Sequence, residues 1–151
     1  NLFDFWYEDF LNGNRVSIRY FDGLLETILL GKSSSCGMNG TCTCQFVVES
    51  DGSVYPCDFY VLDKWRLGNI QDMTMKELFE TNKNHEFIKS SFKVHEECQR
   101  CKWFRLCKGG CRRCRDSKED SDLELNYYCQ SYKEFFEYAF PRLINVVKTI
   151  K

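Results

Sequence analysis

The chain has 151 residues, of which 43% are hydrophobic and 28% are charged, and its formal net charge is −1. A chain of this length and apolar content can bury a core of its own as one domain. The near-zero net charge gives no general case for a nucleic-acid partner or an anionic membrane. No run of the sequence approaches the roughly 18 apolar residues of a membrane-spanning helix, so we expect no membrane partner either.

The N-terminus lacks the basic, apolar and small-residue pattern of a secretory signal peptide. We therefore expect a soluble, cytoplasmic protein. The first residue is Asn1 rather than Met, and the chain opens directly in an aromatic stretch, which indicates a piece of a longer polypeptide. Because cytosolic thiols stay reduced, the ten cysteines of this sequence favour metal binding over a disulfide framework.

Three elements are predicted in the first part of the chain. Hydrophobic residues at helical spacing predict a helix over residues 2–12, which Gly13 ends. Residues 16–21, VSIRYF, alternate well enough for a strand. Residues 21–32, FDGLLETILLGK, predict a short helix that ends at Gly31.

Two β-rich runs surround a turn sequence in residues 44–61, CQFVVESDGSVYPCDFYV. The central Ser-Asp-Gly-Ser predicts a β-hairpin. Cys42 and Cys57 bracket this hairpin, so its folding brings two distant thiols together. The sequence thus predicts a small β element with a cysteine on either side.

Residues 74–91 predict one helix that begins with a capping box, because Thr74 and Glu77 stand at the required spacing. The side chains expected on its buried side are Leu78, Phe79, Phe87 and Ile88.

The C-terminal part predicts a polar loop over residues 117–126, whose acids form a solvated face, followed by helices over 127–140 and 141–150. Pro141 should kink the first of these helices or begin the second. The side chains expected to pack inward are Tyr128, Tyr132, Phe135, Phe136, Ala139 and Phe140.

The ten cysteines fall into two groups, one around the hairpin and one in residues 97–114, with a last cysteine downstream. They stand at positions 36, 42, 44, 57, 98, 101, 107, 111, 114 and 129. Zinc could use two C-x2-C pairs, Cys98 with Cys101 and Cys111 with Cys114, as a four-thiolate site. That pairing leaves the other cysteines unused.

Iron–sulfur clusters offer a second interpretation. Bacterial ferredoxins carry a C-x2-C-x2-C-x3-C run whose fourth cysteine binds the other cluster, and the run from Cys98 to Cys111 has this form with a longer middle gap. By that analogy Cys111 crosses over to the hairpin group, and Cys129 completes the second group. The seven Lys and Arg residues between 100 and 115 would offset the negative charge of such clusters. The spacing alone does not decide between a zinc site and iron–sulfur clusters.

The cysteine spacing resembles the SPASM domain, the C-terminal domain of radical S-adenosylmethionine (SAM) enzymes. That domain has the pattern C-x9–15-G-x4-C, then C-x2-C-x5-C-x3-C, then a lone cysteine. Here Cys42, Gly52 and Cys57 give the first part, and the rest falls on Cys98, Cys101, Cys107, Cys111 and Cys129. Cys36, together with YPCDFYV after the hairpin turn, resembles the anaerobic sulfatase-maturating enzymes in particular. The resemblance covers about residues 32–131.

This resemblance implies an α+β fold, a small SPASM-type domain with one β-hairpin, several α-helices and long loops organised around two [4Fe-4S] clusters. Residues 1–31 would be the end of, or the connection from, a radical SAM partial barrel, and residues 32–151 the SPASM auxiliary-cluster domain with C-terminal helices. The ligands implied for the first auxiliary cluster are Cys36, Cys42, Cys57 and Cys111. Those implied for the second are Cys98, Cys101, Cys107 and Cys129. Cys44 and Cys114 are then spare.

The activity implied is that of a radical SAM oxidoreductase, which oxidises a cysteine or serine of a sulfatase to formylglycine. The domain would contribute substrate binding and a catalytic base, Asp58, which directly follows the ligand Cys57; the alternative is that this aspartate caps a turn. The C-x3-C-x2-C motif of the catalytic cluster does not occur here. We therefore expect the SAM-binding residues and a third [4Fe-4S] cluster to lie upstream, and this chain alone to be inactive.

The partners implied are a sulfatase polypeptide and an external electron donor or acceptor such as ferredoxin or flavodoxin, with the protein itself a monomer. Two other functions stay open. One is a SPASM domain of another peptide-modifying radical SAM enzyme, which makes thioether or carbon–carbon crosslinks. The other is a non-enzymatic electron-transfer or zinc-binding module.

Overall fold

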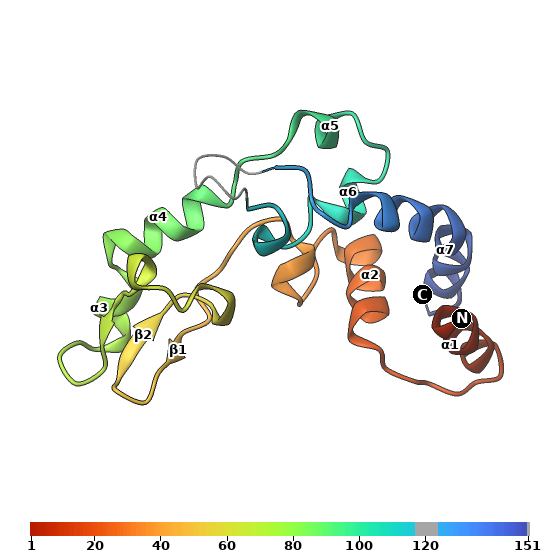
Figure 1. Cartoon of the computed structure of the whole chain (residues 1–151). Coiled ribbons are helices and arrows are strands. Elements are labelled where there is room, and N and C mark those ends of the chain that lie inside the picture. Colours follow the sequence, from red (N-terminus) through yellow and green to blue (C-terminus); the bar gives the residue numbers. More distant parts are fainter. Residues whose placement is uncertain (117–123, 151) are drawn as a thin grey trace.

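The computed structural model describes residues 1–116 and 124–150. It has an α+β fold, as predicted, drawn out into an arch (Figure 1). A small sheet with helices α3 and α4 forms one side of the arch, and helices α1, α2 and α7 form the other. The loops that carry most of the cysteines lie between the two sides. Among the described residues, no helix has both the length and the hydropathy needed to cross a membrane.

The helical side has the larger core. Helices α1 (Leu2–Leu11), α2 (Arg19–Leu30) and α7 (Cys129–Ile150) pack their apolar faces together. The side chains buried there include Phe3, Trp6, Phe21, Leu24, Phe136, Ala139 and Leu143. The predicted first helix and the end of the second at Gly31, which has a φ of +73°, are confirmed.

Polar contacts fasten the first helix to the last. The Asp4 carboxylate accepts hydrogen bonds from the Arg142 guanidinium at 2.7 Å and from the Tyr138 hydroxyl at 2.5 Å. The Arg142 guanidinium also lies 4.1 Å from the centre of the Tyr138 ring. One end of the chain is thereby tied to α7, and both termini lie on the same side of the arch (Figure 1).

The predicted strand over residues 16–21 is wrong, because α2 already begins at Arg19 and the residues just before it form no strand. A strand needs a neighbouring strand for its backbone hydrogen bonds, and the helical side of the arch provides none. In the helix, the Tyr20 and Phe21 rings instead pack against Phe135 of α7, with ring centroids 5.7 and 6.1 Å away. Burial of these aromatic rings outweighs the local alternation.

The predicted hairpin is confirmed, and a third strand extends it. Strands β1 (Val47–Val48), β2 (Ser53–Tyr55) and β3 (Gly68–Asn69) form one antiparallel sheet in that order. Val48 pairs with Val54, and Val54 pairs with Gly68. The third strand escaped the sequence analysis because Gly and Asn have low β-propensity. It is held by the ladder and by a hydrogen bond from the Asn69 side chain to the Asp51 carbonyl, 2.9 Å long.

The helix predicted over residues 74–91 is two helices, α3 (Met75–Phe79) and α4 (Asn82–Ser90). The capping box of Thr74 and Glu77 is confirmed at the start of α3. Thr81 caps α4 in turn, because its side chain accepts a hydrogen bond from the Asn84 N–H. This second cap ends the first helix where the apolar periodicity alone would have continued it.

The break turns Phe79 outward, where 46% of it is exposed, while Leu78 and Phe87 are buried as predicted. Two very short helices follow, α5 (Glu96–Gln99) and α6 (Phe104–Cys107).

The last helix, α7, runs unbroken through Pro141, where two helices were predicted. Proline removes one backbone donor, but Ala139 and Leu143 are buried on either side of it and hold both halves against α1 and α2. Tyr128, predicted to pack inward, is 49% exposed. Most of the predicted polar loop, residues 117–123, lies outside the described residues.

Gly40 offers a test of how tightly the cysteine-bearing loops pack. It has a φ of +70°, and a Cβ there would lie 2.0 Å from the Lys108 carbonyl oxygen. Gly13 has a similar φ of +83° but nothing within 4 Å of such a Cβ. The left-handed backbone alone costs about 1–2 kcal/mol for alanine. We expect Gly13→Ala to lose about that much stability and Gly40→Ala to lose clearly more, measured as thermal unfolding of the anaerobically purified protein. Equal losses would contradict the close approach.

Candidate iron–sulfur sites

The cysteines are free thiols, and the contacts of eight of them fall into two groups. Cys36, Cys42, Cys57 and Cys111 make the first group, which joins a short 3-10 helix (Cys36–Met38), both flanks of the hairpin and the start of another 3-10 helix (Arg112–Cys114). Burial raises the pKa of the Cys36 and Cys42 thiols, and nearby Cys111 raises it further. Burial raises the pKa of Cys57 as well, with an added contribution from Cys42. Electrostatic contacts thus link Cys36 to Cys111, Cys111 to Cys42, and Cys42 to Cys57.

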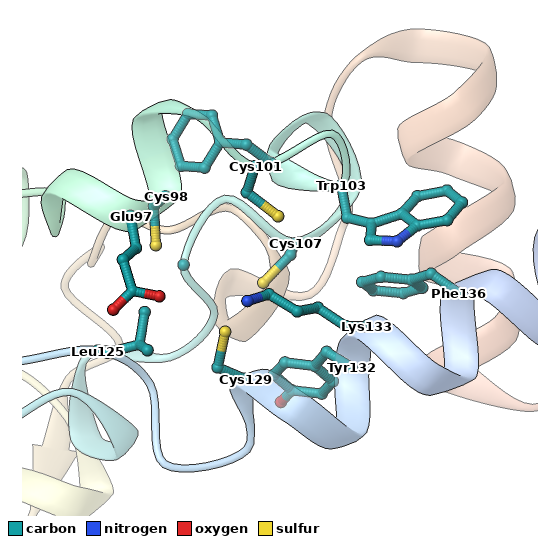
Figure 2. A pocket seen from close by; sticks show the side chains of 12 residues that line it. Glu97, Cys98, Cys101, Trp103, Cys107, Leu125, Cys129, Tyr132, Lys133 and Phe136 are labelled. Atoms are coloured by element: carbon teal, nitrogen blue, oxygen red, sulfur yellow. The ribbon is translucent and has the colours of Figure 1, made fainter.

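The second group is Cys98, Cys101, Cys107 and Cys129, which line one open pocket with about 340 Å³ of empty space. Figure 2 shows their four sulfur atoms pointing toward a common space, and the amino group of Lys133 points into it as well. Burial raises the pKa of the Cys107 thiol to about 11, with added contributions from the other three sulfurs. Trp103 and Phe136 close the apolar side of this pocket.

Helices carry three of the four thiols of the second group. Cys98 lies in α5, whose first turn is capped by the His95 ring; its Nδ1 accepts a hydrogen bond from the Glu97 N–H at 3.3 Å. Cys107 is the last residue of α6, and Cys129 is the first of α7. Each of these thiols thus lies at or near the end of a different helix, so that the three side chains can point toward one space.

A left-handed turn carries the chain from one group to the other. Lys108, Gly109 and Gly110 have φ values of +50°, +83° and +71° in succession. The Asn126 amide donates to the Gly109 carbonyl at 2.9 Å, and a Cβ on Gly110 would lie 2.5 Å from the same amide. The turn lets Cys107 face one group and Cys111, four residues later, face the other. The sequence predicts a crossover between two clusters here, and the division of the ligands between the clusters stays a prediction.

Asp58 is exposed and opens the 3-10 helix Asp58–Tyr60, directly after Cys57. The Cys57 thiol donates a hydrogen bond to its Oδ1 at 3.2 Å. The N-cap of that helix is Cys57, whose side chain makes no capping hydrogen bond. That thiol donor is lost when the sulfur releases its proton and binds a metal as thiolate, which would free the carboxylate toward solvent.

The two spare cysteines differ in their surroundings. Cys44 packs against Val54, Leu67 and Leu78 in the core under the sheet. Cys114 is half-buried and lies within electrostatic range of Cys111. Within the described residues, no three His, Cys, Asp or Glu side chains surround a single point closely enough to hold one metal ion.

The basic run 100–115, interpreted from the sequence as one compensating patch, divides into exposed and buried arginines. Arg112 is buried, with its guanidinium 5.0 Å from the ring centres of Tyr60, Trp65 and Phe87. It pairs with the Asp116 carboxylate at 3.3 Å.

Arg112 also reaches helix α4, where it donates to the Phe87 carbonyl at 3.0 Å and to the Ser90 hydroxyl at 2.7 Å. These contacts connect the segment that follows Cys111 to α4 and to the aromatic residues after the hairpin. The sequence analysis missed this role, although an arginine directly after a candidate ligand, in a chain rich in aromatics, was an available signal.

Comparison with known proteins identifies the class. The SPASM family model, described as an iron-sulfur cluster-binding domain, matches residues 36–102. The cysteine-type anaerobic sulfatase-maturating enzyme of Clostridium perfringens (strain 13 / Type A) is 95% identical over all of this chain, which covers 41% of that enzyme. The corresponding enzyme of Clostridium novyi (strain NT) is 49% identical over 99% of the chain and is covered to 40%.

A solved structure described as native anSMEcpe with bound AdoMet and Cp18Cys peptide superposes with a TM-score of 0.97. It is 95% identical over 100% of this chain, which covers 42% of it. Residues 36–102 thus match the iron–sulfur cluster-binding SPASM family. Over its whole length the chain is similar to the cysteine-type anaerobic sulfatase-maturating enzymes, and it spans about two fifths of the length of the relatives that it matches.

The four thiols around one pocket fit an iron–sulfur cluster, because such a cluster takes four cysteine thiolates from one site. The first group offers the same donor set. Iron–sulfur binding by the domain therefore agrees with the chemistry of the side chains that the structure brings together.

The aromatic cage of Tyr60, Trp65 and Phe87 around Arg112 can be tested with a matched pair of variants. Arg112→Lys keeps the charge but loses the planar contacts and donors, and each lost hydrogen bond to a charged group costs about 1.5–3 kcal/mol. Arg113 is exposed in the same run, so Arg113→Lys should stay within about 0.5 kcal/mol of the parent protein. Thermal unfolding and iron content of the two variants give the comparison. Indistinguishable unfolding temperatures would rule out the cage as a structural anchor.

Proposed function

We propose that this chain is the SPASM part of a cysteine-type sulfatase maturase, which oxidises a cysteine of a sulfatase to formylglycine by radical SAM chemistry under anaerobic conditions. The observation that carries the proposal is 95% identity to the Clostridium perfringens enzyme across the whole chain. The serine-type enzyme of Bacteroides thetaiotaomicron is only 29% identical over 142 residues, which favours cysteine as the target residue.

The domain is proposed to bind two auxiliary [4Fe-4S] clusters. The first would be held by Cys36, Cys42, Cys57 and Cys111, and the second by Cys98, Cys101, Cys107 and Cys129. When bound, these clusters supply redox centres whose potentials depend on net charge, hydrogen bonding and exposure. Residues 1–31 are proposed as the end of, or the connection from, the barrel that would hold S-adenosylmethionine and a third cluster. The chain alone is proposed to be inactive.

Asp58 is proposed as the base that takes the thiol proton of the substrate cysteine. Its support is geometric: an exposed carboxylate is fixed in a short helix beside Cys57, and a base with little positional freedom suits proton transfer. Structures of similar enzymes were solved with the Cp18Cys and Kp18Cys peptides, so a peptide substrate is the partner proposed here. The electron released by the oxidation needs an external acceptor, for which ferredoxin or flavodoxin is the proposed class.

Iron analysis tests the ligand assignment. The full-length enzyme with its C-x3-C-x2-C cysteines changed to alanine should bind about eight irons per chain, four for each auxiliary cluster. Adding Cys111→Ala should lower this toward about four irons, whereas adding Cys114→Ala should leave about eight. Mössbauer spectra identify the cluster type. If Cys114→Ala loses as much iron as Cys111→Ala, the assignment is wrong, and bound zinc without iron would favour the structural module instead.

Asp58→Asn tests the base and the reaction together. Loss of a general base typically lowers a rate by about 100-fold or more. We expect the full-length variant to keep its iron and its peptide binding but to form formylglycine at least about 100-fold more slowly. Asp63→Asn, at another exposed aspartate that opens a short 3-10 helix, is the matched control. Mass spectrometry of a cysteine-containing sulfatase peptide measures the aldehyde, and a thioether or carbon–carbon crosslink would favour the alternative enzyme class. A normal rate in Asp58→Asn would remove Asp58 as the base.

A further inference from the structure

A second buried arginine, Arg115, lies between the two groups of thiols. Only 3% of it is exposed. Its guanidinium donates to three backbone carbonyls, those of Gly40 at 2.8 Å, Ser91 at 3.3 Å and Lys93 at 2.9 Å. All three acceptors are neutral, so they satisfy donors but do not balance the positive charge.

No carboxylate among the described residues forms an ion pair with Arg115. The buried Nε of Arg115 has no hydrogen-bond partner in the described part of the chain. Arg112, three residues earlier, is balanced by the Asp116 carboxylate at 3.3 Å. A buried charge is tolerated when it is paired, and leaving it unpaired is strongly destabilising. Within residues 1–116 and 124–150, Arg115 therefore has no carboxylate partner of the kind that Arg112 has.

The contacts of Arg115 reach toward both thiol groups. On the side of the first group, Gly40 stands two residues before Cys42, and the Ser91 hydroxyl accepts a hydrogen bond from the Cys42 N–H at 2.8 Å. On the side of the second group, the Arg115 side chain lies 3.5 Å from the position of a Cβ on Gly109, two residues after Cys107.

We propose that Arg115 is a shared counter-charge of the two auxiliary clusters and raises the reduction potentials of both. The proposal rests on the ligand assignment made above. A four-iron cluster with four thiolates is negatively charged, and its one-electron reduction adds a further negative charge. A fixed cation in a water-poor site stabilises that added charge more than an exposed cation does. Arg115 acts through its charge on the clusters and is not a catalytic residue.

The test compares neutral and charged replacements in the full-length enzyme whose C-x3-C-x2-C cysteines are alanine, so that only the auxiliary clusters titrate. Midpoint potentials come from redox titrations with dithionite, followed by electron paramagnetic resonance. At a potential where the parent clusters are half reduced, Arg115→Met should lower the ratio of reduced to oxidised cluster at least tenfold. A tenfold change in that ratio corresponds to a shift of about 59 mV in the midpoint potential of a one-electron couple. Both clusters should shift in the same direction.

Two controls separate charge from structure. Arg113→Met removes the same charge from an exposed position in the same run and should leave both potentials unchanged, because water screens it. Arg115→Lys keeps the charge but loses most of the carbonyl contacts, so its potentials should stay close to those of the parent while its unfolding temperature falls. If Arg115→Lys shifts the potentials as far as Arg115→Met, or if neither variant shifts them, the proposal is overturned.

Cluster loading distinguishes the possible failures. If the parent protein itself binds no iron, the cluster assignment fails rather than the role of Arg115. If Arg115→Met does not load iron, Arg115→Gln, which keeps an N–H donor, replaces it in the titration. Failure of both neutral variants to load, with normal loading of Arg115→Lys, would support the requirement for a cation. Equal failure of all three variants would overturn the proposal in favour of a purely structural side chain.

Discussion

The crossover between Cys107 and Cys111 is the constraint on which the rest of the structure depends. Two thiols only four residues apart face different groups, so the chain has to reverse within a few bonds. Three successive left-handed residues, Lys108 to Gly110, make that reversal, and the Asn126 side chain closes over it. Glycine is required because a Cβ at Gly110 would collide with the Asn126 amide. A regular helix or strand could not divide two neighbouring cysteines in this way.

Around this turn, the domain has little regular structure and depends on side-chain anchors. The first thiol group borders the aromatic core of Tyr60, Trp65 and Phe87, while Cys107 borders the core of the helical side. Arg112 and Arg115 connect the segment after Cys111 to α4 and to the loops that precede Cys42. The two buried arginines take the place of a hydrophobic core in the middle of the arch. Specific hydrogen bonds fix the relative positions of the thiols more narrowly than apolar packing would.

The sequence predicted the features that local chemistry controls. The hairpin, the capping box of Thr74 and the helix end at Gly31 follow from residues adjacent in the chain, and all three are confirmed. The division of the cysteines into two sets of cluster ligands stays a prediction, which rests on their spacing and on the ferredoxin counterpart of the crossover.

Features that depend on tertiary contacts escaped prediction. Residues 16–21 do not form the predicted strand, because the helix buries Phe21 against α7. Strand β3 forms because β2 provides backbone hydrogen-bond partners for it. The roles of Arg112 and Arg115 could not be distinguished in a run of similar charges. Their difference lies in partners more than 20 residues away, Phe87 for one and Gly40 for the other.

The attachment of α1 to α7 has a mechanical consequence. Helix α7 has 22 residues and is therefore roughly 33 Å long. The Asp4 carboxylate of α1 binds it near its middle, through Tyr138 and Arg142. Cys129 is the first residue of the same helix. A small tilt of α1 would therefore move α7 with it and displace the sulfur of Cys129 at the end of that helix. The geometry of the second thiol group is in this way coupled to the position of the first helix of the chain.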